Sequence, residues 1–468
     1  MNMRIAAASW VLAGALALAA PGAAAGEEGS AGAGDRRLDE VLEEMERQRA
    51  EIEALKARLA AEDGSGGVAD AVKKYLESEE GRKALGVGTT DFRVSWKEGL
   101  SFETADRAFS LKVGGRVHYD VVLPDADDAV EALPGVGDID ATVGLRRARF
   151  EMSGTIHECV YFANSIEFAG SGTTFKNNYV GLKGLPGGLS VQAGFFKEPA
   201  GLEEMTSASV ITFIERSLAN NAFAPAQNNG FMVLGSHADD RLNWAVGDFQ
   251  DNASQGPAAT AFQHNFTGRV CGVPWRDPER NALLHLGASV QDRSPETEND
   301  RFRVRPSVPF VARTQDTGVF SVDSEFVVGL EAALVHGPWS VQGEVWRADI
   351  EDHPDAPGAS PTYGGYYGTV SYWVTGESRP YKGGSFGRVK PKSEFTPKGG
   401  TGALELAARY SALDLDDDGQ DGGAGHDLTL GANWHLNPNT RVMLNYVMYT
   451  RTHVGDVNSI LVRFQIDF

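Results

Sequence analysis

The longer, C-terminal part of the chain alternates apolar and polar residues with a period of two. The alternation runs from Val113 to Phe468 in segments of about 9–12 residues, the length of a strand that crosses a membrane. In LRRARFEMSG (145–154) it predicts that apolar side chains point outward and charged ones inward: Ala148, Phe150 and Met152 against Arg147, Arg149 and Glu151. About 16 such segments follow one another, and an even number suits an all-β, antiparallel transmembrane barrel.

The connections between these segments alternate between short and long. Short turns fall at 157–158, 186–188, 239–241, 336–338 and 437–439. Long polar stretches fall at 124–142, 196–227, 292–320, 352–361 and 414–425. Residues 375–402 break the rule, because they are long but fall on the short-turn side. Short turns on one rim and long loops on the other are typical of outer-membrane barrels, although alternation alone also fits a soluble β-sandwich.

The first 25 residues have the three parts of a secretory signal peptide. Arg4 supplies a basic start, Ile5–Ala20 an apolar core and Ala23–Ala25 a small-residue cleavage site. A membrane anchor is the alternative, but the apolar run is short and rich in alanine. Later in the sequence, no run approaches the ~18 consecutive apolar residues of a transmembrane helix. We therefore predict export and cleavage after Ala25.

Between the signal peptide and the barrel, the sequence predicts a short helical coiled coil. After a flexible stretch at 26–35, residues 36–62 carry a heptad pattern with an apolar seam: Leu38, Met45, Ile52 and Leu59, with Val41, Gln48 and Leu55 between them. A single solvated amphipathic helix is the alternative, because three heptads are marginal and Gln48 weakens the seam. A linker and short helix at 63–112 then lead into the barrel at 113–468.

Composition narrows the possible functions. The formal net charge of −21 argues against a nucleic-acid partner, because phosphate neutralisation needs a surplus of Lys and Arg. Cys159 and Cys271 are too few for a disulfide framework, and the sequence leaves open whether they pair. The ten histidines lack a metal-ligand spacing, and no GxSxG nucleophile motif is present. The sequence therefore predicts no enzyme, no catalytic residue, no cofactor and no metal site.

One acidic stretch resembles half of a calcium loop. In DLDDDG (414–419), Asp414, Asp416 and Asp418 precede Gly419, but the twelfth position is Gly425 instead of a bidentate glutamate. The favoured interpretation is an acidic external loop that divalent cations bridge to lipopolysaccharide. The expected surroundings are then outer-membrane lipid and lipopolysaccharide.

The connection at 196–227 is too long for a hairpin loop and only partly polar. Its apolar side chains need something to pack against: Val210, Ile211, Phe213 and Ile214. Its carboxylates need water or partners: Glu198, Glu203, Glu204 and Glu215. Such an insertion is expected to fold back onto, or into, the body that it connects.

Several segments together resemble the phosphate-selective porin O/P family of Gram-negative outer membranes. They are LRRARFEMSG (145–154), FFKEPAGLEEMTSASVITFIERSL (195–218), AFAP (222–225), VTGESRPY (374–381), GGTGALELAARYSALDL (399–415) and FQIDF (464–468). The resemblance implies a 16-stranded barrel, a homotrimer, passive conduction of small solutes, and a third long loop folded into the lumen. It also implies that residues 375–402 form an extended periplasmic connection.

Anion selectivity in that family is linked to arginine ladders and pore lysines. Candidates on the barrel wall and on 196–227 are Arg116, Arg147, Arg149, Lys197 and Arg216. A second set, Arg301, Arg303 and Arg305, shares one face of an extended segment. That face can equally be the solvated side of a loop. Against them, the connection 196–227 is net acidic, which disfavours anions unless its carboxylates pair with wall arginines. We therefore predict an outer-membrane porin for small hydrophilic solutes, with anions such as phosphate preferred; a general or weakly cation-selective porin and a structural tether are the alternatives.

Overall fold

The computed structural model describes residues 74–75, 78, 92–96, 98–250, 264–295, 299–351, 360–417 and 419–468. The chain divides into two units, 1–89 and 90–468, of which the second contains all the strands. The expected signal peptide (1–25), flexible stretch (26–35) and coiled coil (36–62) lie outside the described residues. Among the helices of the described residues, none is long and apolar enough to cross a membrane.

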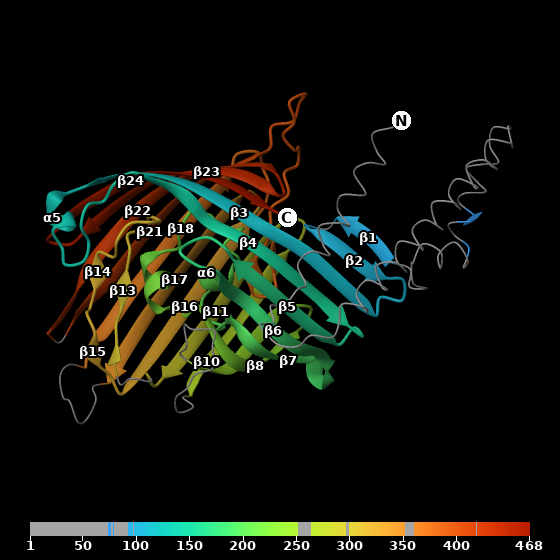
Figure 1. The fold of residues 1–468 in the computed structure, drawn as a ribbon, viewed down its shortest axis with the longest axis horizontal. Coiled ribbons are helices and arrows are strands. Elements are labelled where there is room, and N and C mark those ends of the chain that lie inside the picture. Colours follow the sequence, from blue (N-terminus) through green and yellow to red (C-terminus); the bar gives the residue numbers. More distant parts are fainter. Residues whose placement is uncertain are drawn as a thin grey trace, which may run out of the picture. The chain divides into compact units, whose positions relative to one another are not determined.

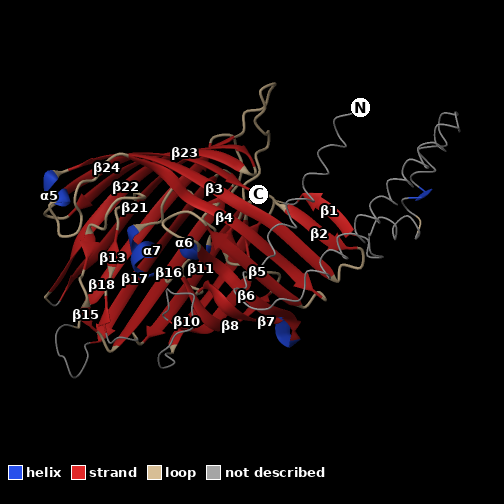
Figure 2. Cartoon of the chain, viewed as in Figure 1, coloured by secondary structure: helices blue, strands red, loops and turns tan. Residues whose placement is uncertain are grey.

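Antiparallel strands close into a barrel in the second unit (Figures 1 and 2). Of the 18 strands in the main sheet of the described residues, all except a short hairpin belong to the barrel, which therefore has 16 strands. They are β3 (Phe109–Ala126), β4 (Thr142–Ile156), β5 (Val160–Glu167), β6 (Thr174–Leu185), β7 (Leu189–Lys197), β8 (Gln227–His237), β9 (Leu242–Gln250), β10 (Asn265–Asp277), β11 (Ala282–Arg293), β16 (Ser324–His336), β17 (Trp339–Glu351), β18 (Thr362–Trp373), β21 (Ala403–Asp417), β22 (Gln420–Asn437), β23 (Thr440–Arg451) and β24 (Gly455–Asp467). Pairing of β24 with β3 closes the ring, so the predicted barrel is confirmed.

The hairpin lies at the short-turn end of the barrel. Its strands β1 (Phe92–Trp96) and β2 (Leu100–Thr104) pair with each other, and β2 pairs with the start of β3. The C-terminal Phe468 exchanges two backbone hydrogen bonds with Gly115, and its ring stacks on Trp96 with centroids 6.4 Å apart. The terminal aromatic is thus part of the seam that closes the barrel.

The two faces of each strand separate apolar from polar side chains, as the alternation predicts. On β24, the outward Ile460 and Phe464 are exposed on the apolar outer face, whereas Arg463 and Ser459 are fully buried on the inner face. A barrel that is apolar outside and polar inside suits a lipid surround and a polar lumen. The assignment to a membrane therefore rests on the alternation of apolar and polar residues with a period of two.

The rims match the predicted connections with one exception. The five short turns connect β4–β5, β6–β7, β8–β9, β16–β17 and β22–β23, and a 3-10 turn, η1 (Pro186–Gly188), forms the second of them. The long connection after β3 contains α5 (Asp128–Glu131), and most of 352–361 lies outside the described residues. The exception is 414–425, which is not a long loop: β21 and β22 extend and pair as far as Asp417 and Gln420. The pairing includes a register shift between Asp414 and Asp416, and Gly419 and Gly423 supply positive φ values of 80° and 92° at this end of the hairpin.

Two long connections enter the barrel from its long-loop rim. Residues 198–226 contain α6 (Leu202–Met205) and α7 (Leu218–Phe223). Residues 299–323 form one folded-back arm with two nested ladders: β12 (Asn299–Asp300) pairs with β15 (Phe320–Ser321), and β13 (Arg303–Val304) pairs with β14 (Gln315–Asp316). Ile214, Leu218 and Phe302 from these segments join one buried apolar cluster with the inward-facing wall residues Trp346 and Tyr363. The loop 196–227 therefore does fold into the body that it connects.

The connection between β18 and β21 differs from the expected extended periplasmic segment. It carries β19 (Tyr381–Lys382) and β20 (Ser385–Phe386), and Phe386 packs with Leu202 and with inward-facing residues of β10, β11 and β16. Its backbone N–H donates to the Thr206 hydroxyl of the opposite insertion, 3.4 Å away. Its longest continuously exposed run is residues 392–401. Apolar residues in the middle of this connection find partners inside the lumen, so they are drawn inward.

The close packing around Gly201, at the start of the insertion 198–226, can be tested. Gly201 and Gly318 both have φ of 70°, but a Cβ at Gly201 would lie 2.6 Å from Glu344 and from Trp346, whereas none of the described atoms lies within 4 Å of a Cβ at Gly318. Both alanine variants incur left-handed backbone strain of about 1 kcal/mol. Gly201→Ala adds overpacking of about 1–3 kcal/mol, so it is expected to unfold at lower denaturant concentration in a gel-shift titration. Equal midpoints for the two variants would contradict the tight placement of Gly201.

Candidate pore constriction

The insertion 198–226 is held to the inner wall by hydrogen bonds to its backbone. Glu344 accepts from the N–H groups of Leu202 (3.1 Å) and Glu203 (2.6 Å). Further donors and acceptors come from four other strands: Ser411 and Asn445 accept from loop N–H groups, and Asn433, Arg441, Arg463 and Gln465 donate to loop carbonyls. An irregular backbone away from bulk water needs such partners for its polar groups. The wall therefore fixes the path of the loop.

All four carboxylates predicted on this loop form ion pairs. Glu198 pairs with Arg293 (3.2 Å) and Glu203 with Arg409 (3.3 Å). Glu204 lies between two cations of the loop and its flank, Lys197 (2.7 Å) and Arg216 (3.0 Å), and Glu215 forms a fork with Arg146 of β4 (2.7 and 3.1 Å). The loop that is acidic in sequence is thus neutralised in place.

These pairs also set the pKa values of the loop carboxyls. Burial alone would raise the pKa of Glu204, but Arg216 and Lys197 outweigh it and hold that pKa below its usual range. Burial opposes ionisation of Glu215 in the same way, and Arg146 and Arg147 more than offset it, so the pKa of Glu215 lies far below its usual range. Both groups carry a negative charge at neutral pH, and each charge is compensated.

A hollow of about 520 Å³ lies between this loop and the wall formed by β3–β8. Seven cationic side chains line it: Arg116, Arg146, Arg147, Arg149, Lys176, Lys197 and Arg216. The structure thus brings together five of the residues singled out from the sequence, all those predicted outside 301–305. The acidic lining residues are Glu167 and Glu204.

Some of these cations are paired and others are not. Arg116 forms a fork with Glu151 (2.7 and 2.8 Å), and Arg149 pairs with Glu167 (3.1 Å). Within the described ranges, Arg147 and Lys176 have no carboxylate within ion-pair distance. The hollow therefore keeps uncompensated positive charge, on the half-buried Lys176 and on Arg147, which is only 7% exposed.

Arg146 and Lys176 line the hollow but were not singled out from the sequence. Strict alternation from Arg147 and Arg149 directs Arg146 outward, but the register between β3 and β4 shifts at His118/Tyr119, and this bulge turns Arg146 inward as well. Lys176 lies beside another register shift, between Asn164 and Ile166 of β5. Because the outward Phe175 and Val180 lie an odd number of residues apart, alternation alone does not place Lys176.

The other three predicted cations lie elsewhere. Arg301, Arg303 and Arg305 are exposed along one face of the insertion 299–323, and the alternating Phe302 and Val304 are buried beneath them. Arg301 is paired with Asp316, with Nε and Oδ1 2.6 Å apart. The shared face was predicted from the sequence, but none of the three lines the 520 Å³ hollow.

The chain is similar to known proteins over most of its length. The family described as "Phosphate-selective porin O and P" matches residues 111–468. The chain is 30% identical to an uncharacterized protein of Caulobacter vibrioides over 404 residues (80% of this chain, 77% of that one), and 24% identical to Porin O of Pseudomonas aeruginosa over 425 residues (82% and 92%). Among solved structures, OmpT of Vibrio cholerae matches with a TM-score of 0.49 and 12% identity, covering 77% of this chain and 98% of OmpT.

The family match covers the whole barrel and both rims. Membership makes the chain an outer-membrane diffusion channel and not an enzyme. The sequence resemblance is thereby confirmed: this chain belongs to the phosphate-selective porin O and P family.

Proposed function

We propose that this porin preferentially passes small anions, phosphate among them, through the basic hollow beside the loop 198–226. The observation that carries the proposal is the lining of the hollow. Seven cationic side chains line it, and several of them pair with nearby carboxylates. Arg147 and Lys176 have no carboxylate partner among the described residues, so positive charge remains there. Fixed charge at a narrow place decides which ions pass.

Neutralisation of the loop removes the main objection to an anion path. Had Glu203 and Glu215 faced the lumen unpaired, their charge would repel anions. Both are instead bound to arginines of the wall, at Arg409 and Arg146. The loop then narrows the channel without adding an uncompensated negative field.

The geometry supports transfer between weak sites instead of tight capture. An anion that meets the exposed face of Arg301, Arg303 and Arg305 has several guanidinium groups to contact. In the hollow, Arg147 and Lys176 offer contacts that compete with no tight ion pair. Several weak sites in series allow a solute to bind and also to leave, as conduction requires.

The sequence also predicts the oligomeric state of the barrel and its lipid surroundings. We infer a homotrimer and contacts with outer-membrane lipid and lipopolysaccharide, which the apolar outer face of the barrel supports. A general or weakly cation-selective channel and a structural tether are the alternative functions. Single-channel recording distinguishes them: a tether gives no conductance steps, and reversal potential in asymmetric KCl gives the sign of selectivity.

The first prediction from this proposal concerns Lys176. Lys176→Gln removes one uncompensated charge from the hollow and is expected to lower the chloride-to-potassium permeability ratio by a factor of about 3–10, or about 0.7–1.4 kcal/mol. Reversal potentials in asymmetric KCl measure this ratio. The matched control, Lys398→Gln, removes the same charge from the exposed part of 374–402 and should leave the ratio unchanged. Cation preference in the unmodified protein would refute the proposal.

The second prediction concerns phosphate itself. Added phosphate is expected to reduce the chloride current, because a doubly charged anion occupies the hollow longer than chloride does. The reduction should weaken in Lys176→Gln and persist in Lys398→Gln. A chloride current that is independent of phosphate, in a channel that still prefers anions, would limit the proposal to small anions in general.

The third prediction is a pH dependence. The pKa values of Glu204 and Glu215 are lower in the folded protein than the ordinary 4.5, so their ionised forms stabilise the loop at pH values above about 4.5. This stabilisation is lost as pH falls through the lowered pKa values. Conductance should therefore stay constant from about pH 7 to 5 and become noisy or larger only below about pH 4. A transition between pH 5 and 7 would show that other groups hold the loop.

A further inference from the structure

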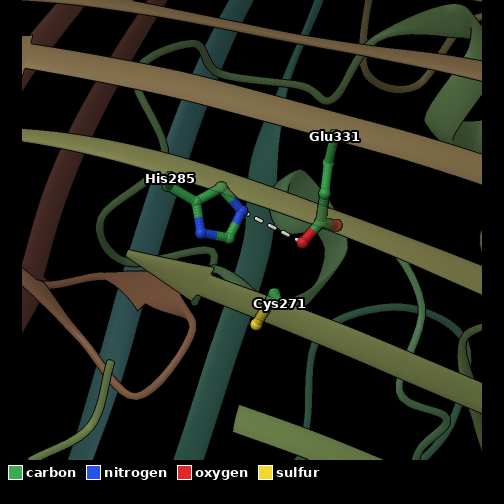
Figure 3. A group of neighbouring side chains, drawn as sticks. All are labelled: Cys271, His285 and Glu331. Carbon is green, nitrogen blue, oxygen red and sulfur yellow. Dashed lines mark hydrogen bonds and ion pairs between the residues drawn. The ribbon is translucent and has the colours of Figure 1, made fainter. Parts of the chain in front are cut away.

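A compact cluster of metal-ligand side chains lies on the inner wall at β10, β11 and β16, away from the basic hollow. It consists of Cys271, His285 and Glu331, and one ligand atom from each lies within 4.8 Å of the other two (Figure 3). All three side chains are at least 95% buried. Figure 3 shows the imidazole and the carboxylate facing each other across a hydrogen bond, with the Cys271 side chain beside them.

A glycine makes this convergence possible. Gly287 of β11 is the cross-strand partner of Cys271 on one side and of Glu331 on the other. A Cβ at this glycine would lie 2.3 Å from Glu331 Oε1 and 2.7 Å from the Cys271 Cβ. The absent side chain leaves room for the carboxylate and the thiol to meet above the sheet, beside His285 two residues earlier on the same strand.

Each nitrogen and oxygen ligand already has a second partner that orients it. His285 Nδ1 is hydrogen-bonded to the Tyr381 hydroxyl (2.6 Å), which leaves Nε2 directed toward Glu331 Oε1 (3.0 Å). Arg269 donates to Glu331 (2.6 Å) and also to the carbonyl of Gly384 (2.8 Å). Protein metal sites commonly hold their histidine and carboxylate ligands with such outer contacts.

The local charge favours a cation. Glu331 lies directly opposite Glu344 in the pairing of β16 with β17, and both are buried. Arg269 balances one of these two carboxylates. Glu344 accepts hydrogen bonds from N–H groups of the loop and from the Tyr367 hydroxyl, so a second carboxyl lies close to the cluster. Two adjacent buried carboxylates are more stable with additional positive charge nearby.

We propose that Cys271, His285 and Glu331 form a three-ligand site for Zn²⁺ or a divalent ion of similar softness. Thiolate, imidazole and carboxylate are the ligand types that zinc prefers, and ligand atoms around a tetrahedral zinc ion lie roughly 3.3–3.8 Å apart. The side chains need to close by on the order of 1 Å. Binding displaces the thiol proton to solvent. The proton between His285 Nε2 and Glu331 moves to Nδ1, which then donates to the Tyr381 hydroxyl oxygen. Nε2 and the carboxylate can then bind the ion, and water completes the shell.

The site gives the ion a structural role. Tyr381 and Gly384, which contact His285 and Arg269, both belong to the inserted connection 374–402. An ion bound to the wall therefore stabilises the position of that connection in the lumen. This role is independent of which solute passes the basic hollow.

The test uses the full-length folded protein and cobalt as a probe. Co²⁺ bound by thiolate gives a charge-transfer band in the near ultraviolet and tetrahedral bands in the visible. Protein folded in the presence of Zn²⁺ should retain one zinc per chain through dialysis, and replacement by Co²⁺ should produce these bands. Tyr381→Phe is expected to weaken Co²⁺ affinity about 10-fold. Tyr366→Phe, which changes an exposed tyrosine of the outer face, should not alter it.

Cysteine variants assign the thiolate. Cys159 is exposed, and Cys159→Ala leaves Cys271 as the remaining thiol, so the bands should persist in this variant. Cys271→Ala should abolish the thiolate band while folding is verified by gel shift. The Cys159→Ala variant is sufficient to test the proposal, so the test does not require Cys271→Ala to fold. Absence of the thiolate band in folded protein, or its loss in Cys159→Ala, would overturn the proposal and leave an ordinary network of Arg269, Glu331 and His285.

Discussion

The inserted loop depends on one constraint: an irregular backbone inside a narrow barrel must have its N–H and C=O groups satisfied by protein. Residues 198–226 are not a strand, so they cannot use the sheet ladder. Wall side chains from β17, β21, β22, β23 and β24 supply the partners instead, in both directions, through Glu344, Ser411, Asn433, Arg441, Asn445, Arg463 and Gln465. Because each unsatisfied buried group costs about 1–3 kcal/mol, the loop has few alternative paths.

This constraint explains why one lumen contains both an apolar core and an ion path. The loop is bound to one sector of the wall, where Ile214 and Leu218 pack with Trp346 and other buried residues. Space then remains on the other side, against β3–β8, where the cations gather. The same side chains that hold the loop, such as Arg146 and Arg409, also cancel its charge. The side chains that anchor the loop are therefore also those that neutralise its charge.

The connection 374–402 enters the lumen from the opposite rim. Phe386 meets Leu202 of the loop in one small apolar cluster, and Arg269 and His285 of the wall bind the connection through Gly384 and Tyr381. Two insertions that enter from different ends thus share a contact. A change at either one is transmitted to the other through packed side chains, because a close-packed interior has few voids to absorb it.

The sequence by itself determined the barrel, its 16 strands, the inward direction of Arg147 and Arg149, and the inward folding of 196–227. These follow from period-two alternation and from apolar residues in a connection that needed a surface, both of which are local. Only the tertiary structure decided the outcome for Arg146, for the inserted part of 374–402 and for the extended hairpin at 414–425. The bulge at Arg146 and the contact between two insertions depend on residues far apart in sequence, whereas the hairpin at 414–425 pairs residues that are close in sequence. The charge of the loop is the clearest case: its glutamates are visible in the sequence, but their partners on distant strands exist only in the folded barrel.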